Sequence, residues 1–263
     1  MSSPDTVIAA LRSEYDLLTQ QVAVFSDDDL AGPSAASEWD ISQVLSHLGS
    51  GAEINRATLQ AALDGTTPGG REFNESVWDR WNAMSRRQRA DGYVVANREL
   101  TELYESLDAD TRNSLMIDMG FLPAPIDVAT AGRIRLNEVA MHSWDIRVAS
   151  DVNATLAPQA VRELLHGEPD FTAWISKPEH LGGESLVLHV TTSEPESDFA
   201  LNLTTPVSTS FEVADKYDGT LTLPAEAWLR LKAGRLAPRY TPTGIVATGA
   251  ADLDLLRKVF PGY

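Results

Sequence analysis

The hydrophobic pattern of this chain changes character near its middle, and that change constrains the fold more than any other feature. Through the first half, apolar side chains recur at steps of three and four residues, the period of a helix that buries one face. After Asp151 the pattern shifts to short strand-like runs separated by turn residues. The sequence therefore predicts an α+β protein, with a helical domain over residues 1–153 and a smaller α+β domain over residues 154–263.

Amphipathic helices joined by loops favour a four-helix bundle for the first domain. Asp40 is a good N-cap for the second helix, and Gln43 can close a capping box with it. Gly92 is able to interrupt the third helix. The expected helices run from near Pro4 to Val22, from Asp40 to about Gly65, from about Glu75 to Leu107 and over about 126–150, and the stretches 27–33, 66–71 and 120–125 are predicted as loops.

The second domain is expected to mix strands and helices. Gly167, Pro169 and Pro178 punctuate the connection to it, so the boundary is expected between Asp151 and Gly183. The predicted strands are 186–191, 199–205, 208–214, 220–223 and 245–248, and the predicted helices are 158–165, 225–233 and 251–259.

Charge and composition exclude several function classes. The chain carries 21 Lys and Arg against 38 Asp and Glu, a net charge of −17, which argues against a nucleic-acid or anionic-membrane partner because either would repel it. It has no cysteine, which excludes a disulfide, a thiolate metal ligand and a cysteine nucleophile. With no secretory signal and no membrane-spanning run, we expect a soluble cytoplasmic protein, as a monomer or a homodimer.

A polar stripe on the fourth helix is the strongest candidate for chemistry. Glu138 and His142 are four residues apart, which puts them on one face about one turn from each other. Arg135 and Asp145 fall on the same stripe, and apolar residues flank it on both sides. Such a stripe points into a bundle, where buried charges must be paired with one another or bound to a metal.

The second helix offers a further imidazole. His47 sits among Val44, Leu48 and Ile54, and Gly51 one turn on leaves room beside its ring, so His47 is expected to face inward. Two imidazoles and one carboxylate form the ligand set of a catalytic zinc site, with a fourth position left for water or substrate. The same ligands also suit iron, manganese, nickel or cobalt.

Each of these residues has an ordinary structural alternative. A Glu–His pair one turn apart is often a surface hydrogen bond, and a single His such as His47 is often a half-buried residue without a ligand role. Asp145 either orients a ligand or forms an ion pair with Arg135 or Arg147. The remaining histidines and several tryptophans are interpreted as surface, strand, core or loop-anchoring residues; they are His166, His180, His189, Trp39, Trp78, Trp81 and Trp144.

Two segments resemble motifs of a known family. The segment 27–54, DDDLAGPSAASEWDISQVLSHLGSGAEI, resembles the N-terminal motif of the mycothiol-dependent maleylpyruvate isomerase family, where a Trp precedes a capped helix bearing His-Leu. The segment 135–149, RLNEVAMHSWDIRVA, resembles the second motif of that family, with Glu, His and Asp in order. The resemblance implies a DinB-like metal-binding four-helix bundle followed by a sterol-carrier-like α+β domain.

The resemblance also implies roles for individual residues. His47, Glu138 and His142 match the metal ligands of the family, whose metal is typically zinc. The cofactor of the family is mycothiol, a thiol of actinobacteria, and the lack of cysteine fits a thiol brought from outside. The segment 229–236, LRLKAGRL, resembles a helix that carries an important arginine, for which Arg235 is the best match and Arg230 the next. We expect Arg235 and Asp145 in catalytic roles, and Arg135 and Arg230 in cofactor binding.

These observations lead to three hypotheses about function. The first is a metal-dependent enzyme that uses a low-molecular-weight thiol, as an isomerase or S-transferase acting on a small electrophile. The second is a hydrolase that activates water at the same metal. The third is a non-catalytic module that binds a small molecule. Metal content and the thiol dependence of turnover separate the three.

Overall fold

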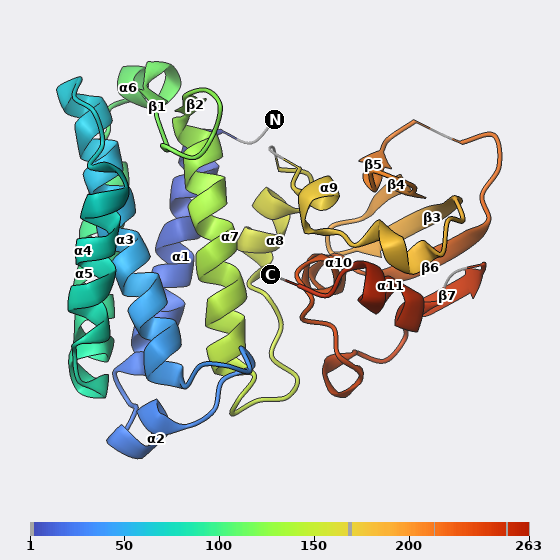
Figure 1. Ribbon diagram of the computed structural model, residues 1–263, viewed down its shortest axis with the longest axis horizontal. Helices are drawn as coiled ribbons and strands as arrows, with labels where there is room; N and C mark the ends of the chain where they lie inside the picture. The colour runs from blue at the N-terminus through green and yellow to red at the C-terminus, as the bar shows by residue number, and fades with distance from the viewer. Residues whose placement is uncertain (1–2, 168–169, 213, 251, 263) are drawn as a thin grey trace. The chain divides into compact units, whose positions relative to one another are not determined.

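The computed structural model describes residues 3–167, 170–212, 214–250 and 252–262. The chain divides into two compact units, Met1–Asp151 and Val152–Tyr263, traced in Figure 1. The first unit is helical and the second carries a sheet, as the hydrophobic pattern predicts. Among the described residues, no helix is both long enough and apolar enough to cross a lipid bilayer.

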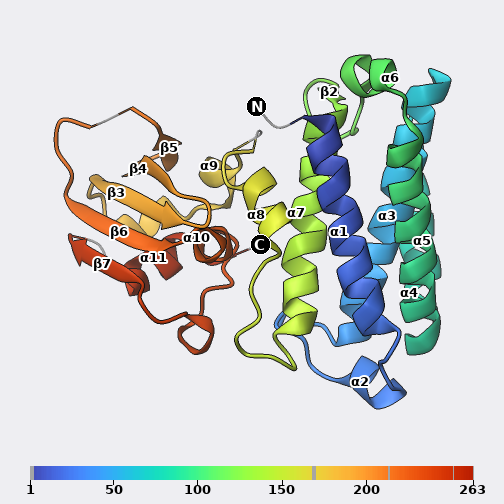
Figure 2. The ribbon, with the colours of Figure 1, turned by 180° about the vertical axis from the view of Figure 1, so that it is seen from behind.

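Long helices pack side by side in the first unit. They are α1 (Pro4–Val22), α3 (Ile41–Asp64), α5 (Arg86–Ser106) and α7 (Val128–Arg147). Helix α3 packs against α5 and α7, and α1 packs against the same two helices from the other side. Figure 2, from behind, shows α1 running alongside α7. Their core includes Leu18, Leu45, Leu48 and Val139, which are almost fully buried.

The prediction of one helix from about Glu75 to Leu107 is wrong, because the chain forms two helices there. The chain instead forms α4 (Gly70–Asn82), which packs along α3, and then α5. Ser85 caps α5 and forms a capping box with Gln88, which fixes the break at residues 83–85. Gly92 does not interrupt the helix, because it lies inside α5. A Cβ there would lie 3.0 Å from the ring of Trp81, so this glycine gives the indole room.

Short elements replace parts of the predicted loops. The sequence predicts a loop over 27–33, but Ser26 and Asp29 form a capping box that starts α2 (Asp27–Ala31). The connection between α5 and α7 contains α6 (Ala109–Ser114) and a small antiparallel pair, β1 (Met116–Ile117) with β2 (Ile126–Asp127).

The described strands of the second unit form a sheet in the order β5-β4-β3-β6-β7. Strand β3 pairs in parallel with β6 and antiparallel with β4, and the other neighbours are antiparallel. Alternate residues of β3 are buried, because α10 packs on β3 and β6 and α8 packs on α10. The strands are β3 (Leu186–Ser193), β4 (Ser197–Leu203), β5 (Ser208–Ser210), β6 (Gly219–Pro224) and β7 (Val246–Gly249).

The helices α8 (Pro158–Leu164), α10 (Ala225–Lys232) and α11 (Leu253–Val259) lie close to their predicted ranges. The sequence did not predict the short helix α9 (Thr172–Ile175) or the 3-10 turns η1 (Pro178–Leu181) and η2 (Pro238–Tyr240). Strand β5 ends at Ser210, four residues before the predicted end. Three predicted features include residues outside the described ranges. They are the connection at Pro169, the strand 208–214 at Val213 and the helix 251–259 at Ala251.

The core of the first unit also contains a carboxyl group, on Glu14 of α1. Its side chain is fully buried, and neither carboxyl oxygen has a hydrogen-bond partner among the described residues. Burial raises the pKa of Glu14, and the charge of Arg147 and the nearby Ser143 hydroxyl offset this only in part.

Replacing Glu14 with glutamine should therefore stabilise the protein at high pH and not at low pH. A carboxyl group whose pKa is raised by folding adds stability below its unfolded pKa, and that contribution is lost as pH rises through the folded pKa. We expect Glu14→Gln to raise the free energy of unfolding at pH 8 by about 1–3 kcal/mol, because glutamine fills a similar volume and does not ionise when the chain unfolds. Urea unfolding at pH 8 and pH 4 checks this, and an equal gain at both values would contradict it.

Candidate metal centre

The structure brings the three predicted ligand side chains together between α3 and α7. His47 comes from α3, and Glu138 and His142 come from α7. One potential ligand atom from each residue lies within 4.8 Å of the other two. Among the described residues, this is the one group of three or more His, Asp or Glu side chains close enough to share a metal ion. Their role as metal ligands stays a prediction.

The contacts within the group are short. His47 Nε2 lies 3.0 Å from Glu138 Oε2, and His142 Nε2 lies 4.0 Å from the same oxygen. The two imidazole rings meet edge to face with their centroids 4.8 Å apart. Each ring therefore directs Nε2 toward the carboxylate, so the three donors converge on one small volume.

Asp145 fixes the orientation of one imidazole. His142 Nδ1 donates to Asp145 Oδ2 over 2.8 Å, and Asp145 is almost fully buried on the next turn of α7. Because Nδ1 carries the proton, Nε2 keeps its lone pair for a cation. Of the alternatives for Asp145, the contact with His142 supports a residue that orients a ligand.

Replacing Asp145 with asparagine should weaken metal binding without removing a ligand. The amide oxygen accepts only a neutral hydrogen bond from Nδ1, and the amide NH2 can donate to Nδ1 instead, so the tautomer that leaves Nε2 free is less strongly favoured. We expect the affinity for Zn²⁺ to fall about 10- to 100-fold, the usual effect of losing such an outer partner. Competition with a chelating dye measures this, and an unchanged affinity would show that His142 is oriented without Asp145.

The charge state of Glu138 suits a metal ligand. Burial alone would raise its pKa, but the hydrogen bond from His47 and the charges of His142, His47 and Arg135 outweigh it and lower the pKa of Glu138 to about 2. The carboxylate is therefore ionised at neutral pH, as a cation requires.

Arg135, on α7 like Glu138 and His142, is buried in the interior of the helical unit. Its Nη2 donates to the Leu48 carbonyl over 2.6 Å and to Asn97 Oδ1 over 2.8 Å, so it links α7 to α3 and α5. Gly51 makes room for this guanidinium and not, as the sequence suggested, for the imidazole: a Cβ there would lie 2.9 Å from Arg135 Nη1. The predicted role of Arg135 in cofactor binding stays a prediction.

The two predicted arginines of the second unit lie in different surroundings. Arg230 on α10 is almost fully buried, and it forms a two-bond pair with Glu226 over 2.7 and 2.8 Å. Arg235 follows α10 after Gly234 and is half-buried, with Nη1 donating to the Ala233 carbonyl over 3.0 Å. The ion pair with Glu226 indicates that Arg230 stabilises the second unit. The predicted roles of Arg230 and Arg235 in binding stay predictions.

Trp39 contacts both candidate imidazoles, although its sequence context predicts only a core or loop-anchoring residue. Its ring centroid lies 5.1 Å from that of His47 and 5.9 Å from that of His142, so the indole covers both imidazoles. The sequence signal available was its position directly before the N-cap Asp40, inside the first motif. Periodicity could not show the contact, because Trp39 lies outside the helix.

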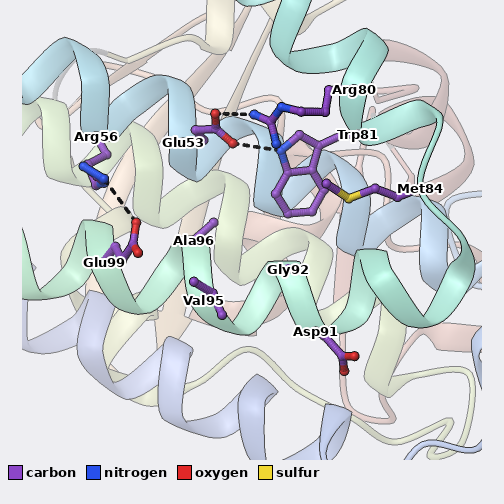
Figure 3. Close-up of a pocket in the computed structure, with 10 residues that line it drawn as sticks. All are labelled: Glu53, Arg56, Arg80, Trp81, Met84, Asp91, Gly92, Val95, Ala96 and Glu99. Carbon is purple, nitrogen blue, oxygen red and sulfur yellow. Dashed lines mark hydrogen bonds and ion pairs between the residues drawn. The ribbon is translucent and has the colours of Figure 1, made fainter.

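A surface pocket of about 460 Å³ lies elsewhere on the helical unit, between α3, α4 and α5 (Figure 3). Glu53 accepts hydrogen bonds from Arg80 and from Trp81 Nε1 at its edge. At about 100° per residue, Glu53 lies about 240° round α3 from His47. The pocket is therefore on another face of the helix than the metal-ligand candidates.

Other histidines have partners within the second unit. His166 Nε2 lies 2.7 Å from Ser197 Oγ, and His189 Nε2 lies 3.0 Å from Asp198 Oδ1. His180 lies in η1. These positions are on the surface or on a strand, as predicted from the sequence.

Comparison with known proteins gave a family and a fold. The model of the family described as the mycothiol maleylpyruvate isomerase N-terminal domain matches residues 11–147. A crystal structure of the mycothiol-dependent maleylpyruvate isomerase is 12% identical, with a TM-score of 0.65 over 96% of this chain and 98% of that one. A structure of a histidine-to-alanine mutant gives a TM-score of 0.64 at the same identity and coverage. The comparison with curated proteins gave no match.

Proposed function

The chain belongs to the mycothiol maleylpyruvate isomerase family, and on this premise we propose that it is a metal-dependent enzyme that uses a low-molecular-weight thiol. One observation carries the proposal: His47, Glu138 and His142 offer ligand atoms within 4.8 Å of one another. Membership of the family adds the thiol, which the chain cannot supply because it has no cysteine.

The donor set fits a catalytic zinc ion. Two neutral imidazoles and an ionised carboxylate are three protein ligands, and a catalytic site keeps the remaining position for water or substrate. The Nδ1 bond of His142 to Asp145 leaves Nε2 of that ring free for a cation. Iron, manganese, nickel and cobalt accept the same donors, and zinc is our first proposal among them.

We propose a separate role for each residue of the site. His47, Glu138 and His142 would hold the cation, and Asp145 keeps the proton of His142 on Nδ1. A cation held there would supply one thing, a lower pKa for a thiol brought to the site, so that the thiol would be available as a nucleophilic thiolate. Mycothiol is the proposed thiol, and the cytoplasm is the proposed location because small thiols stay reduced there.

The proposed substrate is a small electrophile with a carboxylate. Arg235 is our proposal for the group that binds this carboxylate, since a guanidinium can hold it with two parallel hydrogen bonds. Arg135 and Arg230 remain proposals for cofactor binding. The reaction is an isomerisation if the thiol is released unchanged, and an S-transfer if the product keeps it.

Turnover with and without thiol tests the proposal. Purified protein is loaded with Zn²⁺ and assayed on maleylpyruvate and other small electrophiles with no thiol, with mycothiol and with a simple alkyl thiol. The proposal expects zinc bound at about one equivalent and turnover that requires the thiol. Turnover of an ester or amide without thiol would indicate a hydrolase, and protein without stoichiometric metal would indicate a binding module; either result overturns the proposal.

A further inference from the structure

The segment 33–40, which precedes α3, links the two helices that carry the candidate ligands, α3 and α7. Pro33 and Asp40 form an isolated antiparallel bridge that closes residues 33–40 into a compact loop. Ser34 Oγ donates to the Trp39 carbonyl over 2.8 Å, which fixes the backbone at Trp39. The Ala35 amide donates to the Asp145 carbonyl over 2.9 Å. The loop is therefore continuous with α3 and hydrogen-bonded to α7.

The anchor on α7 is the residue that orients one of the imidazoles. The backbone carbonyl of Asp145 holds the loop, while its side chain accepts from His142 Nδ1. The position of the loop and the orientation of His142 thus depend on the same turn of α7. Trp39 is placed by this loop, half-buried against the core of the helical unit.

The contacts of the indole are with rings that belong to different helices. Its plane is tilted by 39° to the ring of His47 and by 36° to the ring of His142. An imidazole with one free side can turn about its Cβ–Cγ bond, since that torsion has broad minima. His47 is the more exposed of the two rings, so the indole is the larger restraint on His47.

We propose that Trp39 is a positioning residue of the metal centre, which holds the imidazoles of His47 and His142 at the separation at which both bind one cation. The inference rests on the proposed metal centre. It adds a further condition for metal binding beyond the three ligands. An aromatic ring must lie against both imidazoles for the site to be preorganised.

Variants of Trp39 should separate positioning from general stability. Trp39→Leu removes the ring contacts, and we expect its affinity for Zn²⁺ to fall about 10- to 100-fold, as for other groups that orient ligands. Trp39→Phe keeps an aromatic ring and should recover most of that loss. Trp78→Phe is the control, since Trp78 is an exposed residue of α4.

The experiment uses the full chain stripped of metal. Zn²⁺ affinity is measured by competition with a chelating dye, thermal unfolding checks the fold, and Co²⁺ titration is followed by tryptophan fluorescence. Co²⁺ quenches an indole only at short range, and Trp144, two residues from His142 on α7, is close enough to contribute as well as Trp39. We therefore expect the quenching to be smaller in Trp39→Phe and unchanged in Trp78→Phe. This fluorescence readout holds even if Trp39→Leu fails to fold.

The outcomes distinguish the inference from the metal centre itself. If the unaltered chain binds neither Zn²⁺ nor Co²⁺, the proposed metal centre fails and the role of Trp39 fails with it. If the unaltered chain binds Zn²⁺ but Trp39→Leu binds it equally well, the role of Trp39 alone is overturned. Quenching that is unchanged in Trp39→Phe would also overturn it, because the metal would then lie away from this indole.

Discussion

Alanine in place of His47 should leave the protein folded and without bound metal. The substitution removes the one candidate ligand that α3 contributes, so Glu138 and His142 would have to hold the cation alone. Because a catalytic zinc site relies on three protein ligands, we expect metal content to fall from about one equivalent to nearly none, and thiol-dependent turnover to be lost with it.

The fold should tolerate this change. The side chain of His47 is 38% exposed, so little apolar packing is lost, but Glu138 loses a hydrogen-bond donor. The free energy of unfolding should therefore fall by only about 0.5–2 kcal/mol. His189→Ala is a matched control, since His189 is 37% exposed and also pairs with a carboxylate, that of Asp198. Elemental analysis after dialysis measures the result. Full metal loading of His47→Ala would remove His47 from the ligand set.

Loss of the Arg230 side chain should destabilise the second unit strongly. Arg230 and Glu226 form a pair on α10 whose two charges are largely withdrawn from water, and Arg230 Nη1 also donates to the Tyr240 carbonyl over 2.9 Å. Removing one partner of such a pair leaves the other charge without compensation. We expect Arg230→Ala to lower the free energy of unfolding by about 3–5 kcal/mol.

Two comparisons make the Arg230 prediction specific. Arg71 pairs with Glu75 at the same four-residue spacing but in an exposed position, so Arg71→Ala should change stability by less than about 0.5 kcal/mol. The double variant Arg230→Met with Glu226→Leu should recover most of the loss, because apolar residues fill the same volume. Urea unfolding compares all of these variants. Equal stability of Arg230→Ala and the unaltered chain would show that the pair contributes nothing.

The start of a helix can be predicted from the sequence where a capping residue and the apolar periodicity agree. Asp40 and Gln43 predict a capping box, and α3 begins there. Ser85 and Gln88 form the same motif, but the apolar pattern runs on across it, so the break between α4 and α5 was missed. A run of apolar positions does not show where a helix stops, since two helices that share a core can keep one continuous pattern.

The site was predictable only in part, for a physical reason. Spacing on a single helix put Glu138 and His142 on one face, and that needed no tertiary information. The contact of His47 with Glu138 depends on how α3 packs against α7, and the sequence suggested it through a resemblance and apolar neighbours. The indole of Trp39 depends on a loop held by the backbone of Asp145, which side-chain patterns do not record.

X-ray absorption at the zinc edge, on purified protein with and without thiol, tests the central claim most directly. Without thiol, we expect imidazole nitrogen and carboxylate oxygen at about 2.0–2.1 Å; with thiol, a sulfur should enter at about 2.3 Å. The chain has no cysteine, so a thiolate sulfur in that shell can come only from the added thiol. A spectrum that stays free of sulfur when thiol saturates the protein would contradict the account.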